Sequence, residues 1–215
     1  MDPLTLAAGG AAALGGLLGL AADRLANRWP EHEPGVAPRG IGWRTLVVVA
    51  GGALLFGGLM LRWPDLRDLA VLAVFGTALV VLLATDLDQR LLPDLLTLPL
   101  IGYAAVVLVL GYSPLLAGRE LGLLSGVAAG IGGPLLLLVT DRILGGDLGG
   151  GDVKLAAAVG LLAGVTRFFG GFLLASLAFA ALLIVLMAAR RVGMRSAVPF
   201  GPVLIGAAGV AMLLP

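Results

Sequence analysis

Repeated apolar stretches constrain this chain more than any other feature of its sequence. A helix that crosses a bilayer needs about 20 mostly apolar residues. Eight stretches approach that length, the sixth being the shortest: 4–22, 45–61, 69–85, 95–110, 120–139, 154–166, 170–189 and 198–214. Only 13% of the residues are charged, against about 25% in an average soluble domain. We therefore predict an all-α, polytopic membrane protein of about eight transmembrane helices, with residues 1–215 forming one integral membrane domain.

The basic residues between these stretches predict an orientation, because cytoplasmic loops are enriched in lysine and arginine. If residues 23–44 form a short cytoplasmic loop, ten basic residues lie on that side: Arg24, Arg28, Arg39, Arg44, Arg90, Arg142, Lys154, Arg190, Arg191 and Arg195. Four lie on the other side: Arg62, Arg67, Arg119 and Arg167. We expect both termini outside the cytoplasm, and a first stretch that is a retained anchor, because its basic residues follow the apolar run.

Composition excludes several classes of function. The net charge is +1 and the basic residues form no cluster, so we expect no nucleic-acid partner. The chain has no cysteine and a single histidine, His32, which argues against disulfides, thiol catalysis and a zinc site. Ser125 and Thr140 have no evident partner base, so a serine mechanism is not expected. Catalysis would have to come from carboxylates, hydroxyls, lysine or arginine.

Two clusters of carboxylates stand out. The first, in "TDLDQRLLPD", contains Asp86, Asp88 and Asp94; the second, in "DRILGGDLGGGDVK", contains Asp141, Asp147 and Asp152. The predicted topology brings both clusters to the cytoplasmic side. Ionisable groups at membrane depth are costly and usually face protein or water. Two carboxylates that share one proton can hydrolyse a peptide bond, so Asp86 and Asp152 are candidates for a catalytic pair.

The spacing around the first aspartate is informative. Asp86 and Asp88 are two residues apart, about 200° around a helix, so at most one of them can point into a site. Pro93 prevents the preceding helix from continuing and lets the chain turn before the next span.

The second aspartate has a different setting. Gly149 and Gly151 have no side chains, so a substrate backbone could pass close to Asp152. Lys154 follows two residues later and would point away from Asp152 on a helix.

These residues leave three interpretations open. Asp86 and Asp152 could form a catalytic pair. They could be loop charges at the membrane interface, next to flexible glycines. They could also relay protons or cations in a transporter, although the chain shows no obvious inverted repeat. A catalytically silent assembly subunit is a further alternative.

Both aspartate motifs resemble those of the type IV prepilin peptidases. "GGGDVKLAAAVG" is similar to the family's glycine-x-glycine-aspartate signature. "DLDQRLLPDLLTLPL" is similar to its second signature, an aspartate followed seven residues later by a proline and an acidic or amide residue, here Asp86, Pro93 and Asp94. "GLAADRLANRWP" resembles the exit from the first span in the spacing of Gly19, Arg28 and Pro30. The resemblance extends over nearly the whole chain and includes the eight-span layout.

The resemblance implies a membrane aspartyl peptidase of the bacterial cytoplasmic membrane, facing the cytoplasm. It implies that Asp86 and Asp152 are catalytic, and that the protein removes short basic leaders from type IV prepilins or pseudopilins. Asp88 and Asp94 would be supporting or substrate-facing groups, together with Pro93, Gly149, Gly151 and Lys154. An acidic site would suit a basic leader. The sequence names neither the pilin nor an oligomeric state.

Three departures from the family pattern concern its second activity, N-methylation by S-adenosylmethionine. Many members carry two CxxC pairs after the first span, and residues 23–44 contain no cysteine. Val49 stands where a glutamate is usual, and Asp23 where an asparagine is usual. We therefore expect a short form of the family with no zinc, no use of S-adenosylmethionine and no cofactor.

Overall fold

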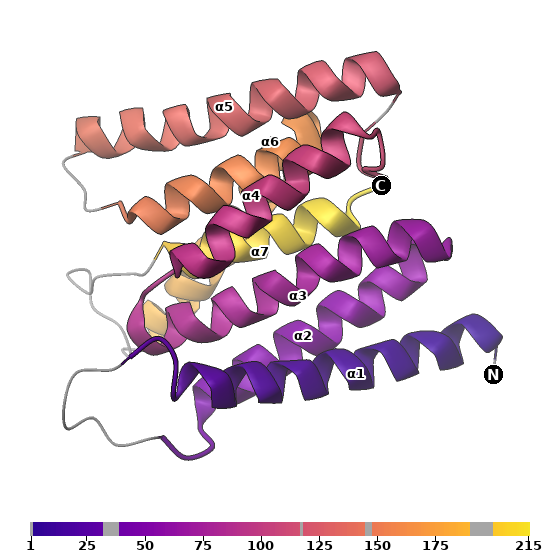
Figure 1. Ribbon diagram of the computed structural model, residues 1–215. Coiled ribbons are helices and arrows are strands. Elements are labelled where there is room, and N and C mark those ends of the chain that lie inside the picture. The colour runs from indigo at the N-terminus through magenta and orange to yellow at the C-terminus, as the bar shows by residue number, and fades with distance from the viewer. Residues whose placement is uncertain (1, 32–38, 117, 145–147, 190–199) are drawn as a thin grey trace.

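The computed structural model describes residues 2–31, 39–116, 118–144, 148–189 and 200–215 (Figure 1). His32, Asp147, Arg190, Arg191 and Arg195 lie outside these residues, as does much of the 23–44 loop. Within them the regular secondary structure is entirely helical: α1 (Pro3–Ala26), α2 (Trp43–Arg62), α3 (Leu66–Gln89), α4 (Asp94–Val109), α5 (Arg119–Leu144), α6 (Gly150–Ala188) and α7 (Gly201–Leu213). The prediction of an all-α fold is confirmed.

The helices form two groups with α7 between them (Figure 1). In the first group α1, α2 and α3 pack on one another, and in the second α6 packs on α4 and α5. Helix α7 contacts α6 on one side and α2 and α3 on the other. The two motif aspartates are therefore on different groups, Asp86 on α3 and Asp152 on α6.

Glycines let the helices of each group approach closely. A Cβ atom on Gly52 of α2 would collide with the carbonyl oxygen of Gly15 on α1. A Cβ atom on Gly160 of α6 would lie within 2.6 Å of backbone atoms of Ala129 and Gly130 on α5. Small residues at helix contacts are the usual device for close packing in lipid. These glycines therefore serve the packing of the fold.

Helix α6 bends sharply at Gly164. The sequence suggested separate helices at 154–166 and 170–189, and Gly150–Ala188 does consist of two helices that meet at a kink, with one non-helical residue between them. Gly164 has φ 69° and ψ 178°, a conformation open essentially only to glycine. Ser113 Oγ donates to the Leu162 carbonyl at 2.6 Å, and the Val165 N–H donates to Ser125 Oγ at 2.9 Å. The two hydroxyls thus partner backbone groups on both sides of the bend.

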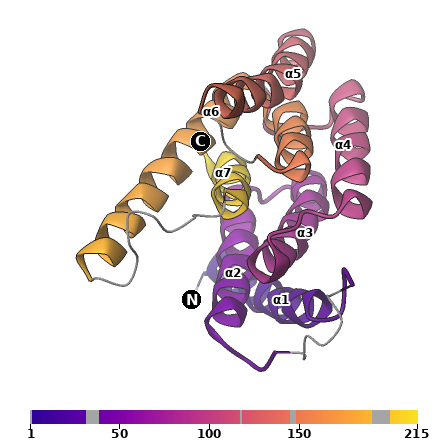
Figure 2. The same cartoon turned by 90° about the vertical axis from the view of Figure 1, so that its left-hand side faces the viewer.

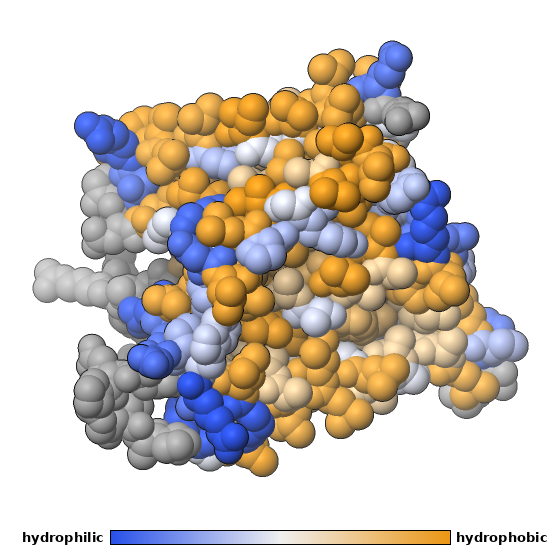
Figure 3. Space-filling model, viewed as in Figure 1, coloured by the Kyte–Doolittle hydropathy of each residue, from blue (hydrophilic) through white to orange (hydrophobic). Residues whose placement is uncertain are grey.

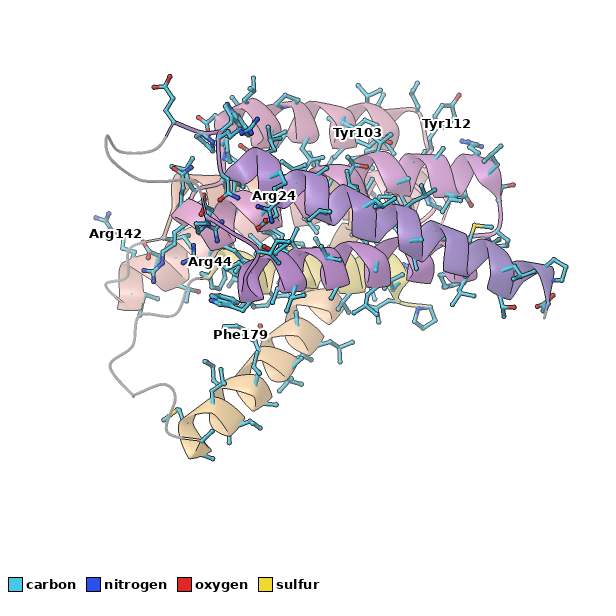
Figure 4. The ribbon with its side chains drawn as sticks, turned by 90° about the horizontal axis from the view of Figure 1, so that it is seen from below. Arg24, Arg44, Tyr103, Tyr112, Arg142 and Phe179 are labelled. Atoms are coloured by element: carbon cyan, nitrogen blue, oxygen red, sulfur yellow. The ribbon has the colours of Figure 1, made fainter. Side chains whose placement is uncertain are left out.

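The second half of α6 projects away from the other helices (Figure 2). Along this arm large apolar side chains are exposed, among them Leu173, Leu177 and Ile184. Figure 4 shows the arm, which carries Phe179, leaving the bundle. An apolar arm of this kind needs lipid or protein around it.

In the part of the chain that the structure describes, five helices are long and apolar enough to cross a membrane: α1, α2, α3, α5 and α6. Helices α4 and α7 are apolar but shorter, with 16 and 13 residues. Hydrophobic residues cover the middle of the visible face and hydrophilic residues gather toward its ends (Figure 3). The protein is a multi-pass membrane protein; the number of crossings and the side on which the termini lie stay predictions.

The basic residues separate to opposite ends of the bundle. Arg24, Arg44 and Arg142 lie at one end and Tyr112 at the other (Figure 4). The guanidinium carbon of Arg67 lies 4.1 Å from the ring centre of Tyr112. Arg62 and Arg167 both stack on Trp63, at 4.7 and 5.6 Å. The end with Arg24, Arg44 and Arg142 is called the motif end below.

Candidate active site

Asp86 lies in the last turn of α3, at the motif end. Arg90 adopts the left-handed conformation (φ 54°) just after the helix, and its N–H donates to the Asp86 carbonyl at 2.8 Å. This is a common way to end a helix. The Asp86 residue is only 5% exposed. The end of α3 thus fixes a buried carboxyl group close to the membrane boundary.

Asp152 lies in the first turn of α6. Gly149 caps this helix, and the Asp152 N–H donates to the Gly149 carbonyl at 3.0 Å. A Cβ atom on Gly149 would lie 3.2 Å from Asp152 Oδ2. The absence of a side chain at Gly149 therefore leaves room for the carboxyl group of Asp152 itself.

The two motif segments contact each other. A Cβ atom on Gly151 would lie 2.6 Å from Leu92 Cβ and 2.9 Å from the Leu92 carbonyl oxygen. Gly151 therefore packs the start of α6 directly on the turn between α3 and α4. As a result, the carboxyl groups of Asp86 and Asp152 are near enough to interact electrostatically.

Both carboxyl groups keep a buried oxygen without a partner among the described residues, Oδ2 of Asp86 and Oδ1 of Asp152. Buried polar atoms are normally hydrogen-bonded, so an exception needs an explanation. Two such oxygens on neighbouring carboxyl groups are suited to sharing a proton or binding a water molecule. The arrangement can support general acid–base chemistry on a peptide carbonyl.

Asp88 points to a different set of partners. Its Oδ1 pairs with Arg39 Nη2 at 2.6 Å and with Arg44 Nη1 at 3.5 Å. Arg39 also approaches the buried Asp23, which accepts a 2.9 Å hydrogen bond from Thr45. The expectation that Asp86 and Asp88 face different directions is confirmed, and Asp88 ties α3 to the start of α2 and to the segment before it.

Asp94 and Lys154 join the two motif segments on the outside. Asp94 opens α4 immediately after Pro93, which caps this helix. Lys154 Nζ lies 2.5 Å from Asp94 Oδ1, and the side chains are 34% and 60% exposed, respectively. This ion pair links α4 to α6 beside the Gly151–Leu92 contact. A basic substrate segment would have to compete with Lys154 for Asp94.

The ion pairs of Asp88 are more buried than the pair of Asp94, so we expect their loss to lower the free energy of unfolding by different amounts. Asp88→Asn should destabilise the protein on the order of 2 kcal/mol, less than the roughly 3–5 kcal/mol of a fully buried pair, because Arg39 and Arg44 reach solvent. Asp94→Asn should cost less than about 1 kcal/mol, as exposed pairs do. Thermal unfolding of the purified proteins in detergent measures the difference. Equal midpoints for both variants would contradict the structural role given to Asp88.

An apolar groove of about 620 Å³ runs along the bundle beside the arm of α6. Residues of α2, α3, the arm of α6 and α7 line it, all of them apolar. Leu87 of α3 and Pro202 of α7 belong to its lining. Leu87 and Pro202 are the chain neighbours of Asp86 and Gly201, so the groove comes close to the end of α3 that carries Asp86.

Sequence reasoning missed Gly201, whose backbone lies against the Asp86 carboxyl group. Pro202 marks a helix start, because proline suits the first turn, but nothing local relates this helix to Asp86. Arg39 and Arg44 as partners of Asp88 were also missed. No group of three or more potential metal ligands occurs among the residues that the structure describes.

Comparison with known proteins finds several bacterial relatives that are similar to this chain over most of its length. A prepilin leader peptidase/N-methyltransferase of Burkholderia pseudomallei (strain K96243) is 37% identical over 175 residues, 78% of this chain and 53% of that protein. Proteins of the same name from Bacillus subtilis (strain 168) and Dickeya chrysanthemi are 30% and 31% identical, covering 75% and 81% of this chain and 62% and 61% of theirs. The chain thus spans between half and two thirds of the length of these relatives. No solved structure gave a significant match.

The match to a family covers the part of the chain that holds both aspartates. It extends over residues 73–186, just over half of the chain, and includes the end of α3, the start of α6 and everything between them. The chain belongs to the type IV leader peptidase family.

Proposed function

We propose that the protein is an aspartyl endopeptidase that removes leader peptides from type IV prepilins or pseudopilins. The observation that carries this proposal is the pair formed by Asp86 and Asp152. The two carboxyl groups interact, and each has one buried oxygen without a partner among the described residues. The matched family and the names of the relatives support the choice of substrate. The protein would act in the bacterial cytoplasmic membrane with the motif end toward the cytoplasm.

The chemistry needs the two carboxyl groups to act together. One carboxylate draws a proton from a water molecule that attacks the peptide carbonyl carbon, and the other carboxyl group donates a proton to the carbonyl oxygen. The pair titrates jointly, so neither proton belongs to one residue alone. Collapse of the tetrahedral intermediate breaks the C–N bond, with a proton passing to the leaving amine.

The groove supports a substrate with an apolar segment next to the scissile bond. Its lining is apolar throughout and includes Leu87, at the end of α3 that carries Asp86. An apolar helix that follows the leader could lie in this groove while the leader remains at the motif end. Asp88 and Asp94 already pair with basic side chains of the protein, so attraction of a basic leader to them would require exchange of partners.

We further propose that the protein lacks N-methyltransferase activity and needs neither zinc nor S-adenosylmethionine. The sequence has no cysteine, and Val49 stands where a glutamate is usual in the family. Asp23, at the position where an asparagine is usual in the family, accepts a hydrogen bond from Thr45.

Co-expression with a prepilin, followed by mass spectrometry of the pilin N-terminus, tests the proposal. We expect loss of the leader and an unmethylated mature N-terminus. A methylated N-terminus would contradict the second part of the proposal alone. Failure to cleave several prepilins would contradict the first part and favour a transporter, which a flux assay in liposomes would detect.

A further inference from the structure

We infer that Gly201, at the start of α7, is a positioning residue that sets the orientation of the Asp86 carboxyl group. A Cβ atom on Gly201 would lie within 2.6 Å of Cγ, Oδ1 and Oδ2 of Asp86. Real Cβ atoms essentially never approach other heavy atoms so closely. Gly201 is buried, as is Asp86, so neither group can relieve such a contact by turning into solvent.

The contact involves the whole carboxyl group. At other close glycines, such as Gly58 and Gly76, the neighbours are ends of leucine side chains, which can change rotamer. Asp86 has only two side-chain torsions, and its backbone is fixed in the last turn of α3. A side chain at position 201 would therefore force the carboxyl group itself to move.

Hydrogen bonds are made at both ends of helix α7, including the end that touches Asp86. The Val203 and Leu204 N–H groups donate to the Phe200 carbonyl at 3.0 and 3.2 Å. At the other end, Trp63 Nε1 donates to the Met212 carbonyl at 2.8 Å, and Arg167 Nη1 donates to the Leu214 carbonyl at 2.6 Å. Because α7 also packs on α2, α3 and α6, neighbouring helices restrict the movement of this helix away from the Asp86 carboxyl group.

Helix α7 lies between the two helix groups. Asp86 belongs to the first group and Asp152 to the second, and α7 contacts both α3 and α6. A helix in that position can hold the carboxyl group of Asp86 in one orientation relative to Asp152. The catalytic consequence rests on the proposed function, whereas the contact itself does not. Small errors in the position of reacting groups are costly, about a hundredfold for 1 Å.

A double-mutant cycle on thermal stability tests the contact without any activity. Wild type, Gly201→Ala, Asp86→Ala and the double variant are purified in detergent and their unfolding midpoints compared. We expect Gly201→Ala to lower the midpoint by about 4 °C or more with Asp86 present, and by less than half as much with alanine at position 86. If Gly201→Ala alone fails to fold, Asp86→Ala should restore the folded protein.

Gly206→Ala is the matched control on the same helix. A Cβ atom there would meet only Ala175 Cβ, at 3.9 Å, so its effect on the midpoint should be small and the same in both backgrounds. An equal loss from Gly201→Ala with and without the Asp86 carboxyl group would overturn the inference.

Cleavage kinetics test the positioning role. Gly201→Ala should lower kcat about tenfold or more with KM within about threefold, because the substrate still binds while the carboxyl group is displaced. Gly102→Ala, where a Cβ atom meets nothing within 4 Å, should leave both constants near wild type. An unchanged kcat in Gly201→Ala would overturn the inference. Absence of cleavage by wild-type protein would contradict the proposed function and leave the stability cycle as the deciding measurement.

Discussion

Replacement of either motif aspartate by asparagine is expected to abolish leader cleavage while the protein remains inserted and folded. Asparagine has nearly the shape of aspartate but cannot exchange a proton, and the proposed reaction needs one carboxyl group to accept a proton while the other donates one. Asp86→Asn and Asp152→Asn should each lower kcat by at least about a thousandfold. The two carboxyl groups act as one unit, so the loss of either removes the contribution of both. Cleavage of a co-expressed prepilin, followed by mass spectrometry, measures the loss.

The thermal stability of the two asparagine variants should not fall together with their activity. Asp86 Oδ2 and Asp152 Oδ1 are buried without partners among the described residues, and burial of unpaired carboxyl oxygens is costly. An asparagine at either position should therefore leave the unfolding midpoint unchanged or raise it. This combination distinguishes a catalytic pair from a structural one, because loss of a structural pair lowers stability.

Asp68→Asn is the matched control, since Asp68 lies on α3 at its opposite end. It should retain wild-type cleavage. If Asp86→Asn or Asp152→Asn retained cleavage, the pair could not be the catalytic centre. If either variant lost cleavage together with several degrees of thermal stability, the aspartate would be structural.

Gly151→Ala is expected to reduce cleavage about a hundredfold, because the added methyl group collides with the turn that connects α3 and α4. The new Cβ atom would lie 2.6 Å from Leu92 Cβ and 2.9 Å from the Leu92 carbonyl oxygen. The backbone oxygen cannot move aside as a side chain could. The start of α6 must therefore shift, which carries Asp152 away from Asp86.

Gly150→Ala provides a close comparison. A Cβ atom on Gly150 meets nothing within 4 Å, so this neighbouring change should cost less than about threefold in kcat/KM. Alanine is favoured over glycine in helices by about 1 kcal/mol, so a loss in Gly151→Ala cannot come from helix propensity. Equal activities of the two variants would contradict the role assigned to the Gly151–Leu92 contact.

The sequence predicted the helical class and most helix positions because hydrophobicity in a membrane protein is a local property. Stretches such as 45–61 and 69–85 became α2 (Trp43–Arg62) and α3 (Leu66–Gln89) within a few residues. It also predicted that Asp86 and Asp88 face different directions, since the angle between neighbouring residues on a helix is fixed. The family resemblance supported the pairing of Asp86 with Asp152, two of the 13 acidic residues.

The position of the bend in α6 could not be predicted from the sequence, for a physical reason. Gly164 is one of 34 glycines, and nothing nearby distinguishes it from those used for packing. What makes the bend stable is the pair of hydroxyls of Ser113 and Ser125, which come from a different part of the chain and bond to Leu162 and Val165. The two expected helices are present, and they meet at Gly164, a few residues before the break that the sequence suggested.

The amino-acid sequence by itself determined that this chain is a helical membrane protein with two aspartate motifs at the same end, because apolar length, charge and motif spacing are read along the chain. Only the tertiary structure decided what surrounds those aspartates. Arg39 and Arg44 hold Asp88, Lys154 holds Asp94, and Gly201 lies against Asp86. Each of these contacts joins segments far apart in sequence, and such contacts depend on how the helices pack and not on any local pattern.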